Sequence, residues 1–455
     1  MKKTTTINPA TEEEIKSYER ISSKEAKGKV AKANETYQTW KKTSFEERSK
    51  LMNKLATIFE ENVEEYAQLA TQEMGKIIKQ SRAEIEKCAK ICRYYAVNIE
   101  ELIADEVIKT EAQKSYVTFQ PLGVTLAVMP WNFPFYQVIR FAAPAVMTGN
   151  TGVLKHASNV QGCAFALEDA FKKAGFPDGV FTNLNLESKD IKAVIEDKNI
   201  VAVTLTGSEP AGRSVAKIAG ENLKKTVLEL GGSDAYIILE DADLEKATDL
   251  ATYGRLQNNG QTCIAAKRFI VLEEIYDDFL KLFTKKMKDA KMGEPTNEEV
   301  YYGPMARVDL RDELHEQVEK TVKQGGKLVL GGKIPDRKGA YYPATILADL
   351  KAGMTGFDEE LFGPVASVIK AKTEEEAIEL ANNSTFGLGS GVITGDSKRG
   401  EKVALQLEAG NSFVNKLVAS DPRLPFGGIK NSGYGRELSS YGIREFVNTK
   451  SIWID

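Results

Sequence analysis

Apolar positions in the first hundred residues recur at helical spacing. Ser44 and Glu47 have the spacing of a capping box, and apolar residues then repeat through 51–59. A second helical pattern covers 77–102, and strand-like stretches follow at 116–119 and 124–129. This part of the chain is therefore predicted to be mostly helical, ending in two strands.

From about residue 150 onward, short apolar runs alternate with amphipathic ones. Helices are predicted at 161–173, 189–196, 211–219 and 276–291, between or after the strands. The predicted strands lie at 152–154, 180–182, 201–205, 226–230, 235–239, 269–272, 344–346, 366–369 and 392–393. Such alternation is typical of βαβ units and of parallel sheets with helices on both faces. The fold class is therefore α/β, with a second α/β unit after about residue 232 and a strand-like tail at 450–455.

Length and composition narrow the protein class. A chain of 455 residues with 42% hydrophobic and 28% charged residues is expected to fold into two or three globular domains. The formal charge of −4, with no Lys/Arg cluster, argues against nucleic acid or an anionic membrane as partner. No apolar run approaches a membrane span and the first residues lack an apolar secretion signal, so a cytoplasmic location is expected.

Few side chains are available for metal or histidine chemistry. The four cysteines are Cys88, Cys92, Cys163 and Cys263, and the two histidines are His156 and His315. So few thiols in a long chain fit a reducing compartment better than a disulfide scaffold. Cys88 and Cys92 can share one helix face, where small core residues are the simpler interpretation. Two imidazoles make a metal site or a Ser-His-Asp arrangement improbable.

Two glycine-bearing segments carry the candidate chemistry. Cys263 ends an Asn-Gly-Gln-Thr-Cys stretch, and Glu229 precedes the glycine pair at 231–232. A carboxylate between Leu228 and Leu230 would be awkward in an otherwise apolar strand, which favours a functional role. A thiolate that attacks an aldehyde forms a hemithioacetal, hydride loss leaves a thioester, and a carboxylate can activate water to release an acid.

Three further segments follow predicted strands. The Pro-Trp-Asn-Phe-Pro loop at 130–134 places Asn132 between two prolines that keep the backbone extended. Gly207 and Ser208 open a helix whose N-terminus suits a phosphate, although an ordinary turn capped by Ser208 explains the same residues. Lys155 and Ser158 follow the strand that ends at 154, and open α/β sheets bind ligands at the carboxyl ends of their strands.

Together with a Glu-Leu-Phe-Gly-Pro segment at 360–364 and glycine-rich stretches at 425–437, these motifs resemble the aldehyde dehydrogenase superfamily in the family's order. The resemblance covers essentially the whole chain. It implies that Cys263 is the nucleophile and that Glu229 is the base that hydrolyses the thioester. It also implies that the amide of Asn132 binds the developing oxyanion, where one lost donor costs roughly 10²–10³ in rate.

The same resemblance implies a dinucleotide site. Lys155 would hold the adenosine ribose, and Gly207 and Ser208 would form the turn that carries the dinucleotide. The nicotinamide end would meet Trp131, Glu360 and Phe362. Members that prefer NAD often have a glutamate at the position of Ser158, and serine removes its repulsion of a 2′-phosphate. NADP is therefore the predicted cofactor, with NAD possible, unless Ser158 only caps the next helix.

Arg140 suggests an acidic substrate. It lies among apolar neighbours on the helix after the 130–134 loop, and succinate-semialdehyde dehydrogenases have a carboxylate-binding arginine at the matching place. Some of them have a second arginine where this chain has Gln257, so Arg255 and Arg423 are candidates to replace it. The sequence of the segment 420–430 also resembles that of bacterial succinate-semialdehyde dehydrogenases.

The predicted reaction is oxidation of succinate semialdehyde to succinate. The alternatives are oxidation of other aliphatic aldehydes, or a catalytically idle descendant, which the intact Asn132, Glu229 and Cys263 argue against.

The expected domain plan has three parts. Residues 1–102 and 122–231 would form a Rossmann-like cofactor domain, and residues 232–431 the catalytic α/β domain. Residues 103–121 and 432–455 would make an oligomerisation element, since an apolar strand at the end of the chain is usually covered. Family resemblance implies a homodimer or a homotetramer.

Overall fold

The N-terminal region combines a hairpin with four helices. The computed structural model describes residues 2–455. Strands β1 (Lys3–Ile7) and β2 (Glu14–Glu19) pair antiparallel, so the prediction of a mostly helical start missed a hairpin. Its strands are short and largely polar, so they lack the apolar runs that mark buried strands. The helices are α1 (Ser23–Trp40), α2 (Phe45–Glu61), α3 (Val63–Met74) and α4 (Ile78–Leu102). The capping box that begins α2 at Ser44 and Glu47 is confirmed.

A six-stranded sheet occupies the first α/β unit, in the order β19-β9-β8-β5-β6-β7. Its strands are β5 (Val124–Met129), β6 (Thr151–His156), β7 (Phe181–Asn183), β8 (Ile200–Thr206), β9 (Lys225–Glu229) and β19 (Gly433–Tyr434). All run parallel except β19, which pairs antiparallel with β9. The associated helices are α5 (Tyr136–Met147), α6 (Gln161–Ala174), α7 (Ile191–Ile195) and α8 (Glu209–Glu221). The predicted alternation of strand and helix is thus confirmed.

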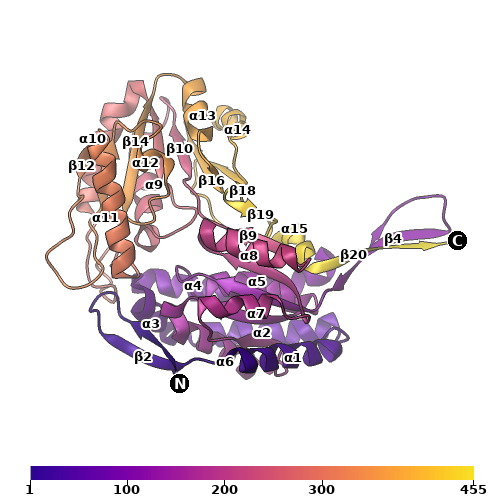
Figure 1. Ribbon diagram of the computed structural model, residues 1–455. Helices are drawn as coiled ribbons and strands as arrows, with labels where there is room; N and C mark the ends of the chain where they lie inside the picture. The colour runs from indigo at the N-terminus through magenta and orange to yellow at the C-terminus, as the bar shows by residue number, and fades with distance from the viewer. Residues whose placement is uncertain (1) are drawn as a thin grey trace.

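A seven-stranded sheet forms the second unit, in the order β12-β13-β14-β11-β10-β16-β17, with only β12 antiparallel. Its strands are β10 (Ala235–Ile238), β11 (Arg268–Leu272), β12 (Lys327–Leu330), β13 (Thr345–Ala348), β14 (Val365–Ala371), β16 (Gly389–Ile393) and β17 (Asn411–Val414). The helices are α9 (Leu244–Leu256), α10 (Tyr276–Asp289), α11 (Val308–Lys323), α12 (Thr355–Asp358), α13 (Glu374–Asn382) and α14 (Ser397–Ala404). Figure 1 shows this unit above the first one.

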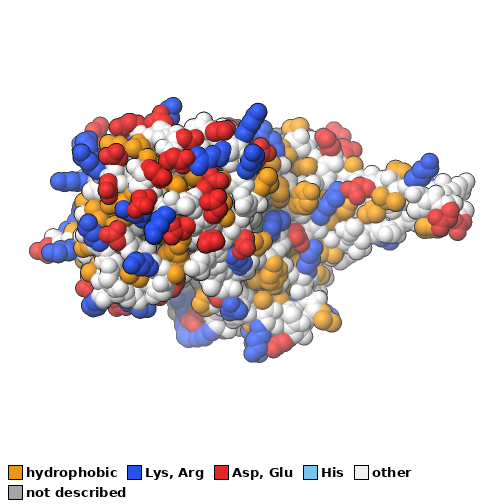
Figure 2. All heavy atoms as spheres, turned by 90° about the horizontal axis from the view of Figure 1, so that it is seen from above, with side chains coloured by type: hydrophobic (Ala, Val, Ile, Leu, Met, Phe, Trp, Pro, Cys, Tyr) orange, Lys and Arg blue, Asp and Glu red, His pale blue; other side chains and the backbone are white. Residues whose placement is uncertain are grey.

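An arm of three strands projects from the body (Figures 1 and 2). The arm consists of β3 (Glu106–Val107), β4 (Lys114–Pro121) and β20 (Val447–Ile454), with β4 in the middle. It begins later than the predicted boundary at 432, because Gly433 and Tyr434 extend the six-stranded sheet and α15 (Ser439–Ile443) follows on the body. Val107, Trp453 and Ile454 are exposed apolar residues on the arm.

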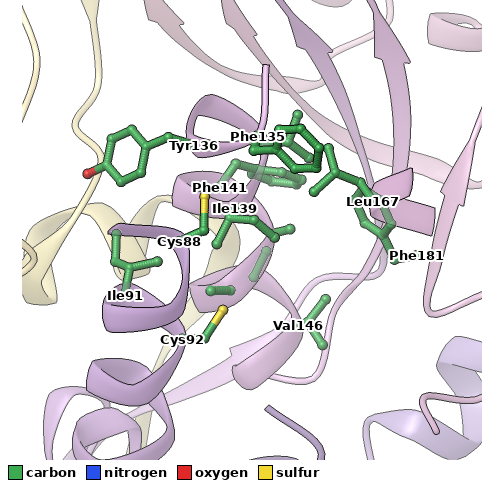
Figure 3. Close-up of a cluster of buried hydrophobic side chains, with 14 of the residues drawn as sticks. Cys88, Ile91, Cys92, Phe135, Tyr136, Ile139, Phe141, Val146, Leu167 and Phe181 are labelled. Atoms are coloured by element: carbon green, nitrogen blue, oxygen red, sulfur yellow. The ribbon is translucent and has the colours of Figure 1, made fainter. Parts of the chain in front are cut away.

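The main core lies where helices of the first unit pack on its sheet. Figure 3 shows side chains of α4 and α5 meeting those of α6 and β7, among them Cys88, Ile139, Leu167 and Phe181. Every residue of α5 is buried. A helix buried on all sides is held rigidly by close packing. The loop before α5 and the side chains on it are therefore well placed to build a site.

Candidate active site

The cysteine segment begins in an unusual backbone turn. Asn258, Asn259 and Gly260 follow α9 with φ of 54°, 57° and 75°. Asparagine tolerates this left-handed region better than most residues, and glycine adopts it freely. A Cβ on Gly260 would overlap the backbone of Gly363, so no larger residue fits there. The turn is thus packed directly against the 360–364 segment.

Side-chain amides fix this turn in place. Nδ2 of Asn259 donates to the carbonyls of Gly75 (2.9 Å) and Pro304 (2.7 Å), and Oδ1 accepts from the Gly303 N–H at 2.7 Å. Oε1 of Gln261 accepts from the Ala306 N–H at 3.0 Å. Four buried hydrogen bonds therefore connect the segment to both parts of the molecule, which offsets the strain of its backbone.

Cys263 faces a cavity of about 170 Å³. Its side chain is partly exposed there, while the other three cysteines are fully buried and all four are free. Burial among protein atoms raises the pKa of the Cys263 thiol to about 11, and the Arg140 and Lys267 charges oppose this. The cavity is lined by Gln80, Ala83, Glu84, Lys87, Phe133, Tyr136, Gln137, Arg140, Tyr253, Gln257, Thr262, Cys263, Ile264, Val418, Ala419, Ser420 and Phe426.

Asn132 lies against the cysteine segment from the other unit. Its Nδ2 donates to the carbonyl of Gln261 at 3.1 Å, and its own carbonyl accepts from Nδ2 of Asn258 at 2.8 Å. The loop before α5 and the turn after α9 thus hold each other in register. The Asn132 amide therefore contacts the backbone two residues before Cys263, which fits a donor to an oxyanion formed at that cysteine.

Glu229 ends β9, opposite Thr206 at the end of β8. It is 2% exposed, and neither carboxyl oxygen has a hydrogen-bond partner among residues 2–455. A Cβ on Gly427 would lie only 2.6 Å from Oε1, so that glycine leaves space for the carboxyl group. Burial and the nearby Glu437 carboxyl raise the pKa of Glu229 well above its usual range, against the Arg140 charge. The Glu229 carboxylate is therefore a stronger proton acceptor than an exposed glutamate.

Arg140 projects from α5 to the wall of the cavity. Its Nε lies 2.5 Å from Oε2 of Glu437, and its guanidinium stacks over the Phe426 ring at 4.8 Å. Burial alone would lower the pKa of Arg140, but the Glu437 and Glu229 carboxyls outweigh it and the net shift is upward. A permanent cation therefore stands beside both the thiol and the candidate base.

The residues predicted for a dinucleotide gather at the carboxyl edge of the six-stranded sheet. Lys155, near the end of β6, is buried and donates to Oγ of Ser188 at 3.1 Å. Gly207 and Ser208 join β8 to α8, and Ser208 caps α8 without a side-chain hydrogen bond. A Cβ on Gly212 would lie 2.6 Å from Leu230, so α8 packs tightly on β9. The open helix end and the buried amine fit an adenosine phosphate group.

The residues predicted to contact the nicotinamide also lie close together. Oε1 of Glu360 lies 2.9 Å from Nζ of Lys267 and accepts from the Gly232 N–H at 3.1 Å. The rings of Trp131 and Phe362 meet edge to face with centroids 5.8 Å apart. The structure thus brings Trp131, Glu360 and Phe362 together between the two units, next to the cysteine segment.

Comparison with known proteins identifies the family. The sequence profile of the aldehyde dehydrogenase family matches residues 1–452. The chain belongs to the aldehyde dehydrogenase family. The predicted family and fold class are therefore confirmed.

The most similar relatives carry a more specific name. The chain is 48% identical over 452 residues to a protein of Mycobacterium tuberculosis named succinate-semialdehyde dehydrogenase [NADP(+)] 1, covering 99% of both. It is also 48% identical over 449 residues to a protein of Synechocystis named probable succinate-semialdehyde dehydrogenase [NADP(+)], again covering 99% of both. Among solved structures, succinic semialdehyde dehydrogenase from Streptococcus pyogenes with NADP+ matches at TM-score 0.97 and 40% identity over 99% of both chains. Gox0499, solved for its cofactor and substrate selection, matches at TM-score 0.98 and 42% identity over 100% of both.

Two arginines proposed from the sequence do not reach the cavity of this aldehyde dehydrogenase. The Arg423 side chain is 75% exposed and pairs with Asp421 at 2.7 Å. Arg255 is fully buried and donates to the Gly260 carbonyl at 2.6 Å. Neither lines the cavity, so the geometry does not support Arg423 as a substrate-binding residue and assigns Arg255 to the cysteine turn.

Lys267 is a site residue that the sequence analysis missed. Its Nζ donates to the carbonyls of Cys263 (2.6 Å) and Thr262 (3.1 Å) besides pairing with Glu360. A lysine four residues after the cysteine, inside the run that leads into β11, was the available signal. It connects the nucleophile segment of the dehydrogenase to the residue expected at the nicotinamide ribose.

Two kinds of feature are absent from residues 2–455. Within that range, no group of three or more His, Cys, Asp and Glu side chains could hold a metal ion. Nor does any described helix have the length and apolar character needed to cross a membrane.

Proposed function

We propose that this aldehyde dehydrogenase oxidises succinate semialdehyde to succinate with NADP, and less readily with NAD. The observation that carries the proposal is the cavity shared by the Cys263 thiol and the Arg140 guanidinium. An aldehyde carbon at the sulfur and a distal carboxylate at the cation would satisfy both ends of such a substrate. The names of the 48% identical relatives support the same substrate and cofactor.

The reaction begins at Cys263. Its thiol gives its proton to water, and the thiolate attacks the aldehyde carbon, which forms a C–S bond and turns the carbonyl oxygen into an alkoxide. The Asn132 amide and the Cys263 backbone N–H stabilise that oxygen. A bound dinucleotide supplies the hydride acceptor, and loss of hydride from carbon leaves a thioester on Cys263.

Glu229 then takes a proton from water, whose oxygen attacks the thioester carbon. The C–S bond breaks, the thiolate returns to Cys263 and the acid leaves as succinate. Because its pKa is raised, Glu229 can both accept this proton and release it later.

Within the chain, Lys155, Ser158, Gly207 and Ser208 would hold the adenosine half of the cofactor, while Trp131, Glu360 and Phe362 would hold the nicotinamide half. Ser158 is exposed at the sheet edge. It presents no carboxylate to a 2′-phosphate, which supports NADP. Ser158→Glu is expected to raise KM for NADP about tenfold or more through charge repulsion, with little effect on KM for NAD. Unchanged constants for both cofactors would remove Ser158 from the site.

A panel of aldehydes tests the substrate. Wild-type enzyme is expected to use succinate semialdehyde with a higher kcat/KM than butanal or pentanal, as followed by the absorbance of reduced nicotinamide. Arg140→Gln should reduce kcat/KM for succinate semialdehyde roughly 30-fold or more beyond its effect on pentanal, because a charged contact is lost. Equal kcat/KM of wild-type enzyme for charged and uncharged aldehydes would instead support a general aliphatic aldehyde dehydrogenase.

We further propose that the arm joins copies of the chain into a homodimer or homotetramer in the cytoplasm. The exposed apolar residues Val107, Trp453 and Ile454 support self-association, and four free thiols fit a reducing compartment. Light scattering on wild-type enzyme and on a Trp453→Lys variant tests the assembly, and a wild-type monomer would refute it.

A further inference from the structure

We infer that Lys87 is the second cation that binds the distal carboxylate of the substrate. The inference rests on the proposed function, because it assigns a partner to the carboxylate of that substrate. It concerns a residue of α4, whereas Arg140 belongs to α5.

Lys87 reaches the same cavity as Arg140 and Cys263. Its Nζ donates to Oγ of Ser420 at 2.8 Å and lies over the ring of Tyr136, 4.2 Å from the centroid. The Tyr136 hydroxyl lies 2.8 Å from the same Ser420 oxygen. The ammonium group is thus held by a hydroxyl and an aromatic face at the cavity wall, and both contacts leave its charge uncompensated.

The surrounding carboxylates are already engaged. No carboxylate oxygen lies within ion-pair distance of Lys87 in the range 2–455, whereas Arg140 pairs with Glu437. Glu84, one turn earlier on α4, pairs with Lys76 and accepts the Phe135 and Tyr136 N–H groups at 2.8 and 2.9 Å. Of the two cations on the cavity wall, Arg140 therefore has a carboxylate partner and Lys87 has none among residues 2–455. A partly buried cation without a partner is unfavourable, so an incoming carboxylate would be bound strongly.

No other side chain suggested by the sequence supplies a second charge to this cavity. Gln257 lines the same cavity without a charge. The substitute arginines suggested by the sequence, Arg255 and Arg423, lie elsewhere. A lysine from a different helix supplies the second positive charge within the same cavity.

The ionisation of Lys87 fits a binding role. Burial lowers the pKa of Lys87 to about 8, and the Arg140 charge adds to this, while Cys88, Glu84 and Asp421 act in the opposite direction. A bound carboxylate would raise that pKa again, so protonation and binding support each other. As pH rises through about 8, Lys87 of the free enzyme loses its charge and the affinity for an anionic aldehyde falls.

The test compares Lys87→Met, Lys87→Gln and Lys87→Arg with Lys90→Met, a control on the exposed face of the same helix. For Lys87→Met and Lys87→Gln, KM for succinate semialdehyde should rise roughly 10- to 100-fold with kcat changed little, since one charged contact is lost. The constants for pentanal should stay near those of wild type. Lys87→Arg should keep most of the preference for succinate semialdehyde over pentanal, and Lys90→Met should keep all of it.

The ratio of kcat/KM for succinate semialdehyde to that for pentanal provides an independent readout. Ionisation of Cys263 and Glu229 affects both substrates and cancels in this ratio. In wild type the ratio should fall above about pH 8, and in Lys87→Arg it should stay level. Equal losses for both aldehydes in the Met and Gln variants, or no loss at all, would overturn the role of Lys87. A wild-type enzyme without preference for the charged aldehyde would overturn the proposed function itself, and the inference with it.

Discussion

Two clusters of buried charge in this molecule are built differently. The first, the helix-junction cluster, consists of Glu73, Glu84 and Lys76. Glu73 accepts the Gly162 and Cys163 N–H groups at 2.8 and 3.0 Å at the start of α6, and Glu84 does the same for α5 while pairing with Lys76. Every charge there is hydrogen-bonded, and the cluster fixes how the helices begin.

The second, the active-site cluster, consists of Glu229, Glu437 and Arg140. Glu229 has no hydrogen-bond partner among the described residues, and burial raises the pKa of both carboxyls above their usual range. The difference teaches that burial alone does not define a role. Where a buried charge is fully bonded it stabilises the fold, and where it lacks partners its proton is available for chemistry.

The cysteines allow the sharpest test of this contrast. Cys263→Ala is expected to lower kcat at least about 10³-fold, because the covalent step is lost, while melting stays near that of wild type. Cys92 is sealed in the core (Figure 3), so Cys92→Ala should keep activity per folded molecule and lose about 1–2 kcal/mol of stability. Steady-state rates and thermal unfolding of both variants test this difference. A similar loss of activity in the two variants would contradict a catalytic role for Cys263 and a structural one for Cys92.

Glu229→Gln should separate acylation from hydrolysis. The first turnover should appear as a burst of reduced cofactor, and the following steady rate should fall on the order of 10²–10⁴-fold because water lacks its base. Stability should not decrease, since the lost carboxyl makes no hydrogen bond. Rapid mixing measures the burst and the steady rate, and thermal unfolding measures the stability. Full turnover in this variant would assign the base elsewhere.

Lys76→Met tests the helix-junction cluster. Removing one partner leaves Glu84 buried without its cation, and the free energy of unfolding should fall by about 3–5 kcal/mol. Lys79→Met, at an exposed position three residues further on, should have almost no effect. Urea unfolding of the two proteins makes the comparison, and equal stability would show that the pair adds nothing to the fold.

The pH profile gives the smallest effect. The pKa of Cys263 is raised to about 11, so its thiol holds a proton at neutral pH and must lose it to react, and the pKa of Glu229 is raised as well. With an uncharged aldehyde and saturating cofactor, kcat/KM should therefore increase with pH, up to roughly tenfold per unit. If kcat/KM were constant between about pH 6 and about pH 9, cofactor binding would already have lowered the pKa values of these groups.

Much of this architecture could be read from periodicity. The buried strands β5, β8 and β9 and the helix α2 stand out because each is a continuous apolar run or an amphipathic repeat. The hairpin of β1 and β2 was missed because its half-exposed strands hold few apolar residues. The pairing of the short strand β19 with β9 was not predicted either, because the other strands of that sheet are far away in sequence.

The site shows the same division. Cys263, Glu229 and Asn132 each belong to a distinctive local segment, so the sequence identified them as candidates. Lys87 and Lys267 lie in ordinary helical and strand-like contexts, and only the packing of α4 and β11 brings them to the cavity and the cysteine. Arg423 does not line the cavity, because a nearby aspartate in its own loop holds it at the surface.

The contact between Gly260 and Gly363 has a practical consequence for redesign. Because the cysteine turn and the 360–364 loop share one tightly fitted surface, the sulfur and the residues proposed to bind the nicotinamide should move together. Remodelling that loop to accept a different cofactor would displace the nucleophile as well. The adenosine end, on β6 and its following turn, is a separate part, so cofactor preference is better engineered there.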